Sequence, residues 1–168
     1  EDAVENDQLV PMRVAALAHE EVVAMSTGYW IAMAVTATGK AYSWGQGDDG
    51  QLGHGDEENQ HHRAVHTPKV VAALEGERVV GVGAAFTHSL FITVGGKVYS
   101  CGRNYHGQLG TGEGEDAHWV MPTLVPAHEL GRAVCVCAGR GTMDELSDSE
   151  EDEEEEEARA DARSHSFS

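Results

Sequence analysis

The chain reads G-K-A-Y-S-W-G-Q-G-D-D-G-Q-L-G-H-G from Gly39 to Gly55, and G-K-V-Y-S-C-G-R-N-Y-H-G-Q-L-G-T-G from Gly96 to Gly112. The two strings share most of their residues at one constant offset, which indicates an internal repeat. We expect the repeated glycines and Gln-Leu pairs to carry the structure of each copy. These positions are Gly45, Gly50, Gln51, Leu52, Gly53, Gly55, Gly102, Gly107, Gln108, Leu109, Gly110 and Gly112.

The repeat extends beyond these strings in both directions. Residues 22–38 match residues 79–95, and a third copy begins at 132–139, which matches 78–85. An earlier copy ends at residues 11–17. The sequence therefore predicts the end of a preceding unit at 1–21, a first repeat at 22–78, a second at 79–131, the start of a third at 132–143 and a tail at 144–168.

Each repeat predicts β-structure. Short apolar runs at 31–36 and 89–93 precede glycine-containing turns, and further strands follow at 40–44 and 97–101. Glycine reaches positive φ without strain and is typical of tight hairpins, whereas runs this short do not suit helices. Repeats of several short strands predict an all-β fold built of propeller blades.

Composition narrows the class of partner. The net charge is −18; residues 1–143 carry 17 acids against 9 Lys or Arg, and residues 144–168 carry 12 against 2. Direct binding of nucleic acid needs a basic surface and is not expected, whereas a basic protein partner fits. No apolar run is long enough to span a membrane, and three cysteines form no disulfide framework. We expect an intracellular protein, cytoplasmic or nuclear.

The strings W-G-Q-G-D-D-G-Q-L-G-H-G and C-G-R-N-Y-H-G-Q-L-G-T-G resemble the blade signature of the regulator-of-chromosome-condensation family. The stretch from Val80 to Leu90 is similar to the strand that opens such a blade. The resemblance implies blades of four antiparallel strands in a ring of about seven. Only two complete repeats are present, so we expect a fragment, a truncated product or half of an assembly. The N-terminal E-D-A-V-E-N-D, which lacks an initiator Met, also suggests processing or a fragment.

Two sequence patterns that could indicate a cofactor or chromophore site are instead interpreted as parts of the fold. Residues 45–50 spell G-x-G-x-x-G, but no helix is predicted after them, so we expect a turn and no cofactor. Trp44 and Cys101 occupy one repeat position and are predicted core residues. A chromophore site is not expected, because Trp30, Trp44 and Trp119 are not equivalent between repeats.

Two other groups of residues could bind a metal. Cys135 and Cys137 replace Gly81 and Gly83 and are predicted to be small buried thiols on one side of a strand. The histidines of the loop after Gly55 are predicted to be solvated, with adventitious zinc binding as the alternative: His54, His61, His62 and His66. We expect no metal site and no enzyme activity, since no catalytic arrangement of side chains is evident.

The tail contains eight consecutive acids from Glu150 to Glu157 and is predicted to be disordered. It either keeps the protein in solution or captures a basic partner, such as a histone tail or a basic localisation signal. Ser147 and Ser149 precede acids in the pattern that an acid-directed kinase recognises, so both are candidate phosphorylation sites.

The sequence favours a non-catalytic scaffold for protein–protein interaction within a larger propeller. The variable loops at 57–67 and 113–120 are the candidate contact surfaces. The alternative is guanine nucleotide exchange on a small GTPase, which the resemblance implies for the founding type of the family. Other members are propeller modules of ubiquitin ligases and a plant UV-B photoreceptor, and the fold alone does not choose among these roles.

Overall fold

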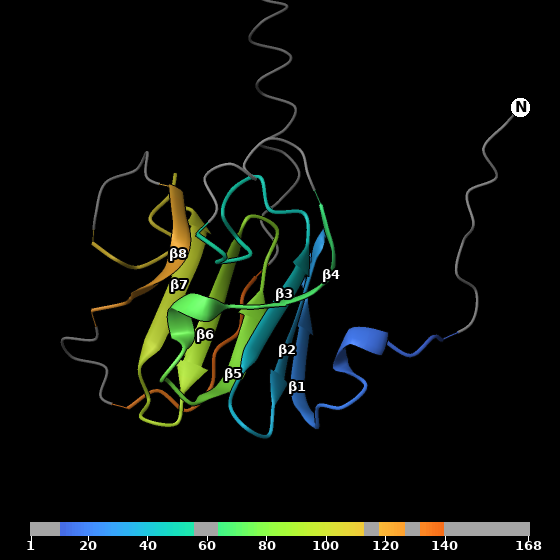
Figure 1. Ribbon diagram of the computed structural model, residues 1–168. Helices are drawn as coiled ribbons and strands as arrows, with labels where there is room; N and C mark the ends of the chain where they lie inside the picture. Colours follow the sequence, from blue (N-terminus) through green and yellow to red (C-terminus); the bar gives the residue numbers. More distant parts are fainter. Residues whose placement is uncertain (1–10, 56–63, 113–117, 127–131, 140–168) are drawn as a thin grey trace, which may run out of the picture.

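The computed structural model describes residues 11–55, 64–112, 118–126 and 132–139. Two four-stranded antiparallel sheets follow one another along the chain (Figure 1). The first contains β1 (Val22–Thr27), β2 (Ile31–Thr36), β3 (Ala41–Gly45) and β4 (Val65–Val70); the second contains β5 (Val79–Ala84), β6 (His88–Thr93), β7 (Val98–Arg103) and β8 (His118–Leu124). The 3₁₀ turns η1 (Ala15–Leu17) and η3 (Ala72–Leu74) precede β1 and β5. The predicted all-β blade fold is confirmed.

The two sheets repeat each other in register. In each, the strand order follows the chain, and a bulge interrupts the pairing near the start of the first strand, at Val22/Ala24 and at Val79/Gly81. Because the strands alternate in direction, the β1–β2 and β3–β4 connections lie at one end of a sheet, and the β2–β3 turn at the other. We call the first end the loop rim; its described residues are 28–30, 45–55, 85–87 and 103–112.

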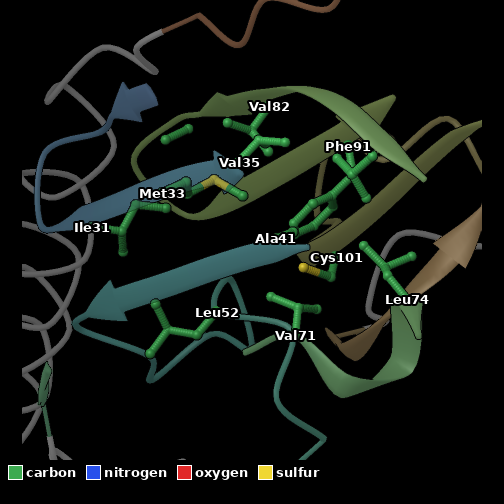
Figure 2. Close-up of a cluster of buried hydrophobic side chains, with 12 residues drawn as sticks. Ile31, Met33, Val35, Ala41, Leu52, Val71, Leu74, Val82, Phe91 and Cys101 are labelled. Atoms are coloured by element: carbon green, nitrogen blue, oxygen red, sulfur yellow. The ribbon is translucent and has the colours of Figure 1, made fainter. Parts of the chain in front are cut away.

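The core lies between the two sheets (Figure 2). Ile31, Met33 and Val35 alternate along β2 and are buried at 3%, 0% and 0% exposure. They share a hydrophobic cluster with Val82 of β5 and Phe91 of β6. Alternate residues of a strand point to the same face, so one face of the first sheet packs against one face of the second.

The hairpins depend on a glycine at the end of β3 and of β7. Gly45 and Gly102 have φ of 111° and 112°, a region that side chains with a Cβ avoid. A Cβ on Gly102 would lie 2.2 Å from the Thr87 carbonyl oxygen, and one on Gly45 would lie 2.2 Å from that of Trp30. The glycine therefore allows the third strand to approach the turn between the first two.

Replacing Gly102 with alanine should lower the free energy of unfolding by more than about 2 kcal/mol, because positive φ and a backbone clash add together. Gly107→Ala is the matched control. Gly107 also has a positive φ of 70°, but a Cβ there has nothing within 4 Å. It should cost only about 1 kcal/mol. Urea unfolding of both variants measures the difference, and equal losses would contradict the clash.

Candidate functional site

The repeated Gly-Gln-Leu-Gly loops lie at the loop rim after β3 and β7. All eight predicted glycines have positive φ, between 64° and 112°: Gly45, Gly50, Gly53, Gly55, Gly102, Gly107, Gly110 and Gly112. Leu52 and Leu109 are buried at 4% and 1% exposure, and Ser43 and Ser100 donate hydrogen bonds to their carbonyl oxygens at 2.6 and 2.8 Å. Each loop is thereby fastened to the middle of its own third strand.

The glutamine of each pair holds the turn before it. Gln51 Oε1 accepts a hydrogen bond from the Asp49 amide at 2.9 Å, and Gln108 Oε1 accepts one from the His106 amide at the same distance. A buried amide group needs such partners. The same hydrogen bond therefore holds the turn in both copies, although only the first loop packs against a neighbouring sheet among the described residues.

The first loop contacts the second sheet directly. The Gly55 amide donates to the Val120 carbonyl of β8 at 2.9 Å, and Cys101 Sγ lies 3.6 Å from the Gln51 carbonyl oxygen. Arg103 donates to Asp49 Oδ1 through Nε at 3.0 Å and Nη2 at 2.8 Å. Backbone bonds and an ion pair therefore join one blade to the next at this loop.

The second loop has no such neighbour in the described part of the chain. Gly50 is buried whereas its equivalent Gly107 is exposed, and a Cβ on Gly107 or Gly112 would meet nothing within 4 Å. Gln51 is 3% exposed, and its equivalent Gln108 is only partly buried. Among the described residues, the loop after β7 therefore exposes the surface that the equivalent loop after β3 uses to bind the second sheet.

The opposite side of the molecule is open as well. Val82 and Ala84 of β5 are 9% and 6% exposed because the first sheet covers them. Their equivalents in β1 are Met25, which is 61% exposed, and Thr27, which is also exposed. The outer face of the first sheet thus corresponds to the blade face that is buried in the second.

A cluster of aromatic side chains bridges the two blades at the loop rim. The rings of Tyr29 and Trp30 are 4.6 Å apart at 86°, and those of Tyr29 and Phe86 are 5.2 Å apart at 63°. Tyr29 and Trp30 are 44% and 54% exposed. The sequence interpretation missed this cluster, although Tyr29 and Phe86 occupy the same repeat position and are both aromatic.

A model of the regulator of chromosome condensation (RCC1) repeat matches residues 38–92 and 95–142, and a second model of the same repeat matches 22–51 and 79–108. The chain belongs to the RCC1-repeat family. Among curated proteins, mouse E3 ubiquitin-protein ligase HERC2 is 36% identical over 155 residues, which is 88% of this chain and 3% of that protein. The Ultraviolet-B receptor UVR8 of Arabidopsis thaliana is 36% identical over 79% of this chain and 29% of its own length.

Solved structures show the same fold. Yeast RCC1 (Prp20), in its complex with Kap60, is 25% identical and has a TM-score of 0.60 over 71% of this chain and 28% of that chain. Human WBSCR16 has a TM-score of 0.63 with 21% identity, covering 73% and 29%. The chain therefore spans less than a third of each of these four proteins.

Residues 132–139 contact the second sheet as the start of the second sheet contacts the first. Arg78 donates to the Ala37 carbonyl at 3.4 Å, and Arg132 donates to the equivalent carbonyl of Val94. The amides of Val79 and Ala133 donate to the Gly39 and Gly96 carbonyls at 3.0 and 3.3 Å. Residues 132–139 therefore lie against the second sheet in the place that the start of β5 takes against the first, although they are not assigned as a strand.

The interpretation of Cys135 and Cys137 as buried thiols is wrong, because both are exposed. Their segment lies against β5, where a Cβ on Gly83 would be 3.1 Å from the Ala138 amide nitrogen. No described segment of the chain packs over the two thiols. Cys101 is fully buried, and burial raises the pKa of its thiol, so it is a core residue rather than a nucleophile.

The described residues contain no cluster of three or more potential metal ligands, and none of their helices could cross a bilayer. His54 Nε2 lies 2.8 Å from Ser43 Oγ, and His66 is exposed on β4. No helix follows the 45–50 turn among residues 51–55. His61, His62, Ser147, Ser149 and the acidic tail lie outside the described residues, as do parts of both predicted contact loops.

The ion pair between Asp49 and Arg103 should couple the two blades. The first repeat has Gln46 where the second has Arg103, so Arg103→Gln is a substitution the fold already accepts. A double-mutant cycle with Asp49→Asn should give a coupling free energy of about 0.5–1 kcal/mol, since both side chains are partly exposed. Lys97 and Glu77, 2.5 Å apart at the end opposite the loop rim, are the control pair. Lack of coupling in urea unfolding would contradict the predicted link.

His88 should make the second blade sensitive to acid. Burial lowers the pKa of His88, so the unfolded chain binds the proton more tightly than the folded chain. Stability should therefore fall as the pH drops below the unfolded value of about 6.5. His88→Ile, which installs the residue found at Ile31, should reduce the loss between pH 7.5 and 5.5 in urea unfolding. The same substitution at the exposed His66 is the control; an equal effect there would contradict the prediction.

Proposed function

We propose that this chain supplies non-catalytic, protein-binding blades to a larger RCC1-type propeller. The observation that carries the proposal is the joint between the two sheets. Among the described residues, each half of this joint also occurs uncovered: the loop surface at Gly107 and Gly112, and the sheet face around Met25. Blades of this kind bury both faces against neighbours of the same kind, and an uncovered apolar face favours association.

The lengths of the solved neighbours support a larger ring. The chain covers 28% of the yeast Prp20 chain and 29% of the human WBSCR16 chain, which is near the share that two blades would have in a ring of about seven. We propose further that the remaining blades complete the ring and that partners bind at its loop rim, where the connections after β3 and β7 begin. Three free cysteines fit an intracellular location, cytoplasmic or nuclear.

Guanine nucleotide exchange is the second candidate. The likeness to yeast Prp20 favours it, because the structure of that protein is described with its binding to Gsp1p and histones. An exchange factor works by stabilising the nucleotide-free state of its partner and needs no group that makes or breaks covalent bonds. A binding surface without catalytic residues is therefore compatible with either function.

Affinity capture from cell extract, with the full chain as bait, tests the proposal. We expect a reproducible partner that is lost with Gly102→Val, which disrupts a blade, and retained with Gly76→Ala. Gly76 also has a positive φ and open space around a Cβ, but it precedes β5 at the end opposite the loop rim. A partner bound equally by both variants would show that folded blades are not required. If the partner is a small GTPase, a rate of nucleotide release that stays at background would remove the exchange function and leave the scaffold.

A further inference from the structure

The aromatic cluster of Tyr29, Trp30 and Phe86, which we call the rim cluster, is not part of a sheet face that a neighbouring blade would cover. It lies on the turns between strands rather than on a face of a sheet, and it spans two blades that are already packed together. Trp30 keeps 54% of its surface exposed despite its contact with Tyr29. Exposed, clustered tryptophan and tyrosine are typical of protein interfaces and their energetic centres.

The surroundings of the rim cluster are acidic. The Gln46 amide donates to the Trp30 carbonyl at 3.0 Å, and Gln46 Nε2 donates to Asp48 Oδ2 at 2.5 Å, so the loop that carries Asp48 is bonded to the backbone of Trp30. Asp49 follows Asp48 and forms an ion pair with Arg103, the last residue of β7. Among the described residues of the rim, the charge of this arginine is therefore already neutralised by a carboxylate.

The charge of the connections has the same sign. The segments 46–64 and 104–117, which leave and re-enter the sheets at this rim, contain eight acidic residues and one arginine in their sequences. At the opposite end, Lys40 and Lys97 each have a glutamate partner, Glu20 and Glu77. Of these acids, Asp48 and Asp49 lie among the described residues of the loop rim, at the end that carries the exposed aromatic rings.

We propose that the rim cluster binds a positively charged segment of a partner polypeptide, with an arginine or lysine side chain placed over the Trp30 ring. The face of an indole attracts cations, and nearby carboxylates strengthen the attraction and steer the approach. An acidic segment would be repelled. This inference rests on the proposed scaffold function and names the chemistry of its partner.

The test uses the full chain and a fluorescein-labelled decapeptide of alternating arginine and glycine that carries one photo-reactive phenylalanine. Trp30→Ala should weaken binding, measured by fluorescence anisotropy at low salt, by roughly fivefold to tenfold. Trp30→Phe, which keeps an aromatic ring, should stay within about twofold of the unsubstituted chain. Val94→Ala, at an exposed apolar residue of the opposite end, is the control and should change nothing.

Photo-cross-linking separates the rim cluster from the acidic tail. The expected cross-links fall on residues 28–31 and 85–87. Cross-links confined to residues 144–168, equal affinities for Trp30→Ala and Val94→Ala, or equal binding of a glutamate–glycine decapeptide would each overturn the inference. If peptide binding fails while a captured partner is retained by Trp30→Ala, the rim cluster is not the contact, but the scaffold function stands.

Discussion

The contact of the glycine-rich loop of one blade with the outer strand of the next is the constraint on which the structure depends. A four-stranded sheet with apolar residues on both faces needs a neighbour on each side, and the loop fixes how that neighbour sits. Gly50 and Gly53 allow β8 to approach so closely that a Cβ at either position would lie about 3 Å from Trp119, Val120 or Pro122. Glycine at these positions is therefore a requirement of the joint as well as of the turn.

The joint is built of two kinds of contact. Some occur twice and concern the backbone at the end opposite the loop rim: the amide bonds from Val79 to Gly39 and from Ala133 to Gly96. Others occur once: the Asp49–Arg103 pair has no second copy, because His106 and Gln46 stand at the equivalent positions. Repeated backbone contacts let any blade follow any other, whereas the unique side-chain contacts determine which blades are neighbours.

The sequence was sufficient to predict the sheets because the repeat places the same strands and turns twice at one offset. It could not show that Cys135 and Cys137 are exposed, since burial depends on strands that would have to pack over them rather than on the residues themselves. The rim cluster was missed for a related reason. Phe86 and Tyr29 lie far apart in sequence, and only the packing of the two blades brings their rings to 5.2 Å. The predicted tail and phosphorylation sites stay predictions.

The outer face of the first sheet and the face of the second sheet that packs against the first differ in shape, although they are equivalent in the repeat. In the second blade, Phe91 and Cys101 are diagonal neighbours on the buried face; in the first, Ala34 and Trp44 hold those places. A large and a small side chain have exchanged positions, so the total bulk is similar while the contour is reversed. Close packing needs matching contours, and the face that fits Phe91 would therefore not fit Trp44 equally well. In the proposed ring, a neighbour of the first blade would therefore need its own complementary surface, and the blades would have fixed positions rather than being interchangeable copies.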